Sequence, residues 1–118
     1  MKKTVIHVDN SDFFRKQMKG FLEAEGFEVE SFDSAQEASF AIGAGTGDIV
    51  IMGLTFSDLN GEDFAVKVIE SFAGPVLVVS SSIDKEKEDH LLELGIKAAI
   101  NKSGLWKDAI KPHLAGLK

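Results

Sequence analysis

The residues with most chemistry to offer are four polar side chains that stand at, or just after, the end of a short apolar run. They belong to Asp9, Asn10, Ser80 and Lys102. If these runs are parallel strands, their carboxyl ends meet at one edge of the sheet, where ligands of such folds bind. A carboxylate, an amide, a hydroxyl and an amine at one edge suit a phosphoryl group held with a metal ion. The sequence therefore predicts a candidate site for phosphoryl chemistry.

The central group of that candidate site is missing. The apolar run 48–52 aims at the same edge, but the residue that follows it is Gly53, which has no side chain. Glycine at a strand exit can serve the backbone, through a positive φ or a close approach. It can also mark a lost nucleophile, because a phosphoryl acceptor of this kind needs a carboxylate in line with the donor.

Short apolar runs alternate along the chain with longer segments of helical period, which predicts repeated strand–helix units. The expected strands are 4–8, 27–31, 48–52, 75–80 and 98–100. The first expected helix has Ser11 as its N-cap and ends at Gly26. The second starts at the serine–glutamate capping box 34–37, and the third spans 61–72. The fourth runs from about Asp84 to Gly95. A last helix carries Leu105, Ala109, Ile110, Leu114 and Leu117, with Pro112 predicting a late start or a kink.

Strands without polar alternation, each followed by a helix, indicate a parallel sheet that is buried on both faces. Five such units predict an α/β fold: a flavodoxin-like, doubly wound five-stranded parallel sheet of order 2-1-3-4-5 with five helices. No repeat or linker interrupts the series, so we expect a single domain over residues 1–118.

Composition excludes several classes of protein. The formal net charge of −6 repels polyanions, so we expect no nucleic-acid partner. The chain has no cysteine and no run near the length of a membrane span. We therefore expect a cytoplasmic protein without membrane contact, as a monomer or weak homodimer.

Four stretches and the spacing between them resemble the receiver domain of two-component response regulators over nearly the whole chain. They are VIHVDNSDFFRK, DIVIMGLTFSDLNGEDF, PVLVVSSS and ELGIKAAINKS. The resemblance implies that the family's acidic, magnesium-holding pair falls on Asp9 and Asn10, of which only Asp9 is acidic. It also implies that the phosphate-accepting aspartate falls on Gly53. The family's hydroxyl residue at the end of the fourth strand falls on Ser80, and its lysine after the fifth strand falls on Lys102, so both are kept.

These losses predict a degenerate phosphorylation pocket, made of Asp9, Asn10, Gly53, Thr55, Ser80 and Lys102, with no catalytic residue and no cofactor. Magnesium would find one carboxylate, the Asn10 oxygen and a backbone carbonyl near Thr55, so we expect weak binding at Asp9 at most. Without the acceptor aspartate, the Lys102 amine should lean toward Asp9, the nearest remaining anion.

The resemblance implies a non-enzymatic pseudo-receiver that binds a protein partner in two-component-type signal transduction. The family's usual output face, carried onto this sequence, includes His90, Lys97, Ala99, Lys107 and Lys111. An aromatic residue usually stands where Ala99 stands here, so this surface is expected to be fixed rather than switched.

Two other functions stay open. A genuine phosphorylated receiver would need a substitute acceptor, and Thr55, Ser57 and Asp58 lie in the loop beside Gly53, although such residues are also ordinary in turns. A small-ligand-binding flavodoxin-like protein is disfavoured because the segment DNSDFF, residues 9–14, lacks a glycine-rich or hydroxyl-rich phosphate loop. His7, His90 and His113 are too far apart along the elements to predict a metal cluster.

Overall fold

The computed structural model describes residues 2–81 and 83–117, so residues 1, 82 and 118 of the expected domain lie outside it. Its centre is a five-stranded sheet in which all neighbouring strands are parallel. The strands are β1 (Thr4–Val8), β2 (Glu28–Phe32), β3 (Ile49–Met52), β4 (Val76–Ser80) and β5 (Ala98–Asn101). Their order is β2-β1-β3-β4-β5, which confirms the predicted flavodoxin-like order.

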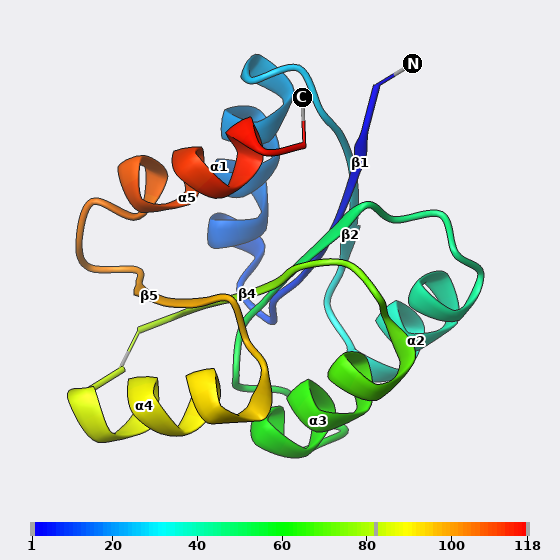
Figure 1. Ribbon diagram of the computed structural model, residues 1–118. Helices are drawn as coiled ribbons and strands as arrows, with labels where there is room; N and C mark the ends of the chain where they lie inside the picture. The colour runs from blue at the N-terminus through cyan, green and yellow to red at the C-terminus, as the bar shows by residue number, and fades with distance from the viewer. Residues whose placement is uncertain (1, 82, 118) are drawn as a thin grey trace.

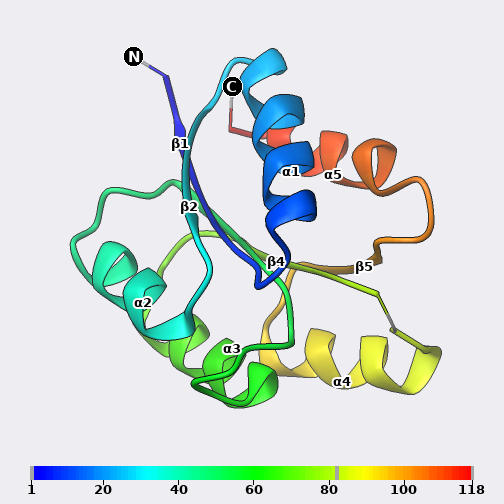
Figure 2. The same cartoon turned by 180° about the vertical axis from the view of Figure 1, so that it is seen from behind.

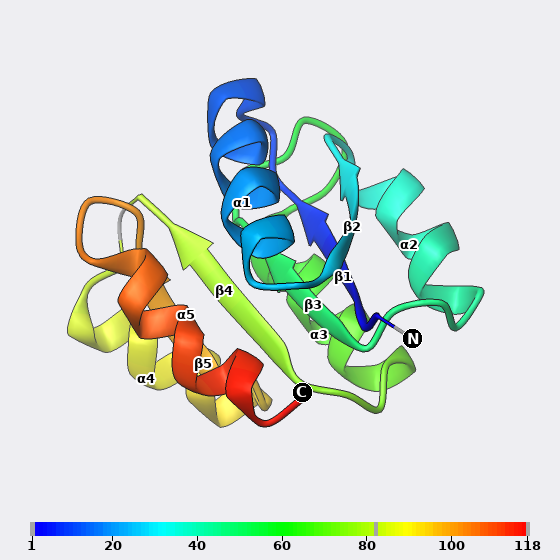
Figure 3. The same ribbon diagram turned by 90° about the horizontal axis from the view of Figure 1, so that it is seen from above.

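A helix follows each strand, and the helices form two layers. They are α1 (Asp12–Ala24), α2 (Ala35–Gly43), α3 (Gly61–Ser71), α4 (Lys85–Leu94) and α5 (Trp106–Ala115). Figures 1 and 2 show α1 and α5 above the sheet and α2, α3 and α4 below it, and in Figure 3, seen from above, α1 and α5 lie over the strands. The chain is therefore doubly wound.

The sheet separates two apolar cores because neighbouring side chains of a strand point to opposite faces. On β1, Ile6 and Val8 pack with α2, α3 and α4, whereas Val5 packs with α1 and α5. All four residues of β3 are fully buried, as expected for a central parallel strand. The two cores hold β1, β3 and β4 rigidly, and the ends of these strands position the candidate site.

Side-chain caps fix where the helices begin. The Ser11 hydroxyl accepts the Phe14 N–H and the Ser34 hydroxyl accepts the Glu37 N–H, which confirms both predicted N-caps. At the other end of α4, Gly95 takes a φ of 110°, a left-handed conformation that favours glycine. The helix starts lie at the same edge of the sheet as the strand ends.

The structure corrects the prediction for the last helix. Leu105 is not on its apolar face but precedes the helix and is 79% exposed, and Ala109 is exposed as well. The buried residues are Trp106, Ile110 and Leu114, spaced i, i+4 and i+8. The helix passes through Pro112 without interruption. Within the part of the chain described here, no helix has the length and apolar character needed to span a membrane.

Candidate functional site

Asp9 is the centre of the candidate site. It follows β1 directly, its side chain is 1% exposed, and its Oδ1 accepts the Ser11 N–H at 2.8 Å. The backbone N–H of Asp9 donates to the Phe32 carbonyl, at the end of the β1–β2 ladder. A buried carboxylate is costly unless it is paired, and the Asp9 carboxylate has this one hydrogen bond, from Ser11, and a neighbouring cation.

The cation that neutralises Asp9 is Lys102. Its Nζ lies 2.8 Å from Asp9 Oδ2, which confirms the predicted lean of this amine toward the remaining carboxylate. The backbone N–H of Lys102 donates to the Ser80 carbonyl at 2.9 Å, and this bond places the residue beside the end of β4. The amine also lies 4.4 Å from the centre of the Phe14 ring, a cation–π contact that further fixes it.

Gly53 lies next to this ion pair. It is buried, and its N–H donates to the Val8 carbonyl at 2.9 Å, so the β1–β3 ladder continues to this residue. The glycines with positive φ are Gly26, Gly45 and Gly95, so the backbone conformation of Gly53 does not require glycine. A Cβ added at Gly53 would lie 3.0 Å from Asp9 Oδ2. The Asp9 carboxylate therefore reaches into the space that a side chain at position 53 would occupy.

The other predicted pocket residues differ in how far they are exposed. Ser80 closes β4 and is half-buried, whereas Asn10 and Thr55 are exposed. The donor set fits magnesium poorly, because one oxygen of the only carboxylate accepts an N–H and the other faces Lys102. Among the described residues, no group of three or more His, Asp or Glu side chains could hold a metal ion.

Arg15 is a site residue that the sequence analysis missed. Its guanidinium donates to the backbone carbonyl of Asp9 and to the Asp12 carboxylate. The i,i+3 spacing of Asp12 and Arg15 was visible in the sequence, but the contact with Asp9 depends on how α1 leaves β1. Arg15 thus fixes the backbone of Asp9 while Lys102 fixes its side chain.

Two side chains tie down the loops beside the site. Asp58, considered above as a substitute acceptor, accepts the N–H groups of Ala35 and Gln36 at the start of α2. The Gln36 hydrogen bond is the main reason why the pKa of Asp58 is lowered. Asn101 accepts the Ile83 N–H at 2.9 Å and donates to the Ile83 carbonyl at 3.0 Å, which holds the β4–α4 loop.

His7 lies within β1, two residues before Asp9, and is fully buried against Phe14. Neither ring nitrogen has a hydrogen-bond partner among the described residues. Burial lowers the pKa of His7 from 6.5 to about 4, and the Asp9 carboxylate opposes only part of that shift. The imidazole is therefore neutral at pH 7.

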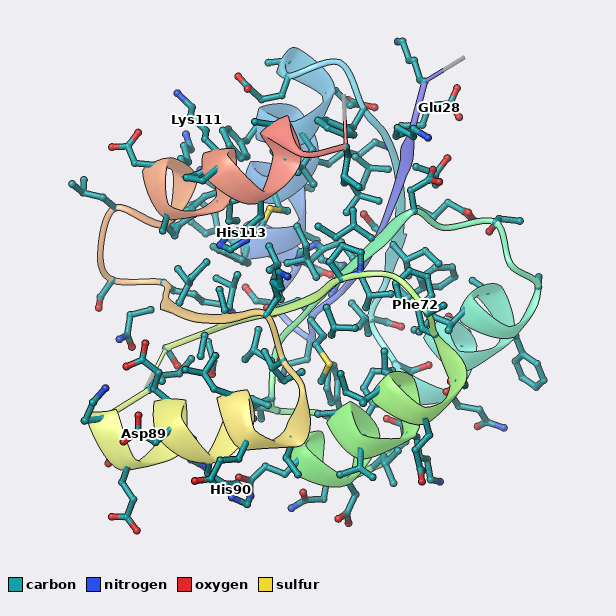
Figure 4. All side chains as sticks on the ribbon, in the orientation of Figure 1. Glu28, Phe72, Asp89, His90, Lys111 and His113 are labelled. Carbon is teal, nitrogen blue, oxygen red and sulfur yellow. The ribbon has the colours of Figure 1, made fainter. Side chains whose placement is uncertain are left out.

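The residues predicted for the partner surface do not all face the same way. Lys97, Lys107 and Lys111 are exposed and Ala99 is half-buried in β5. His90 lies 3.7 Å from Glu62 of α3, so it is on the side of α4 that faces α3. Figure 4 shows His90 below α4, away from α5, and Lys111 on the upper side of α5.

The fold and this edge define a doubly wound α/β protein whose candidate site lies at the carboxyl ends of β1, β3, β4 and β5. The model of the family described as response regulator receiver domain matches residues 5–111. The chain belongs to this family, whose domains act in two-component signalling.

Individual relatives agree with the family assignment. The chain is 34% identical over 96 residues to the protein-glutamate methylesterase/protein-glutamine glutaminase of Bacillus subtilis. That match covers 77% of this chain but only 27% of the relative, so this chain corresponds to a small part of it.

Solved structures share the fold. A receiver domain protein (CheY-like) from Methanospirillum hungatei has a TM-score of 0.88 at 22% identity, over 99% of this chain and 94% of that one. The CheX-CheY-BeF3-Mg complex from Borrelia burgdorferi gives 0.86 at 21% identity, over 98% and 90%.

Proposed function

We propose that this receiver domain works without aspartyl phosphorylation, as a protein-binding module in a cytoplasmic two-component-type pathway. The observation that carries the proposal is the pair Asp9–Lys102, closed at 2.8 Å beside the side-chain-free Gly53. The amine that would neutralise a transferring phosphoryl group is committed to Asp9, and the nucleophile is absent.

The metal requirement supports the same proposal. Phosphoryl transfer to a carboxylate needs a hard cation to neutralise charge on the phosphoryl oxygens. Asp9 would have to release Lys102 to coordinate that cation, and Asn10 offers only a neutral oxygen. The proposal therefore assigns no catalytic step, cofactor or resident metal to this chain.

A substitute acceptor in the β3–α3 loop is disfavoured by geometry. Asp58 is engaged at the N-terminus of α2, and its hydrogen bonds to Ala35 and Gln36 hold it at that helix. Thr55 and Ser57 are exposed, and neither side chain is hydrogen-bonded to a base within the part of the chain that the structure describes.

A protein partner suits a fold that offers binding surfaces but no reaction. One structural neighbour was solved as a complex of CheX with CheY, so a protein of this fold does bind another protein. In this chain the proposed output face offers exposed lysines at positions 97, 107 and 111. Carboxylates of a partner could pair with these lysines.

The test is incubation of the wild-type protein with acetyl phosphate and magnesium, followed by intact-mass measurement. We expect no alkali-labile gain of one phosphoryl group, and we expect amide shifts around Asp9 and Thr55 to stay unchanged during magnesium titration. Stoichiometric labelling would contradict the proposal. Mapping the label to Thr55, Ser57 or Asp58 would establish a substitute acceptor instead.

A further inference from the structure

Phe40 is anomalous among the nine phenylalanines of the chain. Its side chain is 73% exposed, and among the phenylalanines that the structure describes only Phe13, at 72%, is comparably exposed. The fold does not require an aromatic residue there, because α2 packs on the sheet through Ala35, Ala38 and Ile42. An exposed aromatic ring that serves no internal contact is typical of a binding surface.

A shallow hollow of about 270 Å³ lies beside Phe40, between α2 and the neighbouring α3. Figures 1 and 2 show these two helices side by side below the sheet. We call this surface the Phe40 face, and it consists of Gln36, Ser39, Phe40, Asp58, Leu59 and Lys67. The ring and the hollow together form a knob next to a hole.

The charges on the Phe40 face indicate what covers it. Its six residues carry one carboxylate, Asp58, and one ammonium group, Lys67. Neither forms an ion pair with any other residue in 2–81 or 83–117. The face is locally neutral although the chain carries a net charge of −6, so like-charge repulsion between two copies is weak at this face.

We propose that the Phe40 face is a two-fold contact between two copies of this chain. In a two-fold contact every pairing occurs twice. If one residue of the first copy meets another residue of the second copy, the same two residue types also meet with the copies exchanged. Phe40 of each copy would fill the hollow of the other, and Asp58 of each would face Lys67 of the other. The Phe40 ring fits a hollow, and the Asp58 carboxylate fits the Lys67 ammonium group. Because all four lie on one surface, that surface is complementary to a second copy of itself.

This contact is small, so the dimer is weak and concentration-dependent. It is independent of the proposed function, because none of its six residues belongs to the pocket around Asp9. Asp58 can serve both roles, since a carboxylate accepts about four hydrogen bonds and α2 uses two of them.

Sedimentation velocity over a concentration series tests the proposal. We expect the wild type to associate, Phe40→Ser to stay monomeric, and Phe13→Ser to associate like the wild type. Phe13 is the matched control because its exposure is the same and it lies on α1. A wild type that stays monomeric at the highest concentration overturns the proposal, as does a dimer that Phe40→Ser leaves intact.

A charge exchange tests the arrangement within the dimer. Lys67→Glu and Asp58→Lys each place like charges opposite one another, so each alone should weaken association more than about tenfold. An equimolar mixture of the two variants restores opposite charges at both ends of the contact and should associate again. Circular dichroism checks that both variants fold, because Asp58→Lys also removes hydrogen bonds to α2. If both fold and the mixture stays monomeric, the proposed pairing is wrong.

Discussion

At the scale of single residues, Asp9 and a side chain at position 53 compete for the same small space. A Cβ there meets Asp9 Oδ2 at 3.0 Å and the Asp9 Cγ at 3.4 Å. Asp9 has little freedom to withdraw, because Ser11 and Lys102 hold its two oxygens. The Asp9–Lys102 ion pair in this arrangement therefore depends on glycine at position 53. An acceptor side chain placed there would also displace the Asp9 carboxylate.

Gly53→Asp restores the nucleophile but leaves the metal site incomplete. We expect this variant to be labelled slowly by acetyl phosphate, and Gly53→Asp with Asn10→Asp to be labelled faster, because the second carboxylate improves magnesium binding. The added carboxylates should also lower the stability of the metal-free protein through repulsion with Asp9, and magnesium should restore it. Intact-mass measurement and thermal denaturation give the two readouts.

Asn10→Asp alone is the matched control, since it adds the metal ligand without the acceptor and should not be labelled. If the double variant folds but is labelled no faster than Gly53→Asp, then Ser80 and Lys102 are not placed for the reaction. The loss of function would in that case extend beyond Gly53 and Asn10.

His7 makes folding sensitive to acid. Its pKa is 6.5 when unfolded and about 4 when folded, so the unfolded chain binds more protons between these values and stability falls as pH drops from 6.5 to 4. The loss of stability that this shift of the His7 pKa causes is about 3 kcal/mol in full. Between pH 7 and pH 4 the free energy of unfolding should fall in both proteins. The fall in His7→Leu should be smaller than the fall in the wild type by about 3 kcal/mol. Parallel curves from urea denaturation would show that His7 is not buried in its neutral form.

At the scale of secondary-structure elements, α5 is the helix with a removable defect. Pro112 lies inside it and has no N–H to donate to the carbonyl four residues earlier, at Asp108. Pro112→Ala should stabilise the protein by about 2 kcal/mol, the helix gain of about 3 kcal/mol less the entropy that alanine adds to the unfolded chain. Urea denaturation measures the change, with Lys111→Ala as an exposed neighbour that should have little effect. No gain from Pro112→Ala would mean that α5 is already distorted to accommodate the proline.

The sequence predicted the elements well where one local signal decides the outcome. The uniformly apolar β3 and β4 and the capping serines Ser11 and Ser34 have such signals, and the structure confirms them. The last helix was predicted less well, because an apolar period starting at Leu105 competes with one starting at Trp106. Tertiary packing decides between them: Trp106 contacts the rings of Phe14 and Phe21 on α1.

The same distinction applies to the candidate site. The strand ends bring Asp9, Gly53, Ser80 and Lys102 together, and strand order alone was enough to predict this. The hydrogen bonds of Asn101 to Ile83 and of Asp58 to α2 join loops that are distant in the sequence. They depend on loop conformation, which residue type and spacing do not determine.

At the scale of the whole molecule, the pocket and the proposed output face are joined by elements that the structure holds in one arrangement. The β3–α3 loop is tied to α2 through Asp58, and the β4–α4 loop is tied to β5 through Asn101. On β5, Ala99 carries only a methyl group, Ile100 is buried, and the Asn101 amide is held by Ile83. Coupling between two sites requires an element with two alternative arrangements, and along this route the described side chains are small, buried or hydrogen-bonded.

This rigidity predicts that phosphorylation, even when restored, stays local. When the double variant Gly53→Asp with Asn10→Asp is labelled, its amide resonances should shift in the loops at residues 53–60 and 101–104. Those of Lys97, Lys107 and Lys111 should stay where they are, because a new charge at the pocket can bias the output face only through a side chain that has two positions. Two-dimensional NMR spectra recorded before and after acetyl phosphate give the comparison, with unlabelled Asn10→Asp as the control for the reagent. Shifts spread over α4 and α5 would show that the route through β5 transmits without an aromatic residue, and the output face would then be switchable rather than fixed.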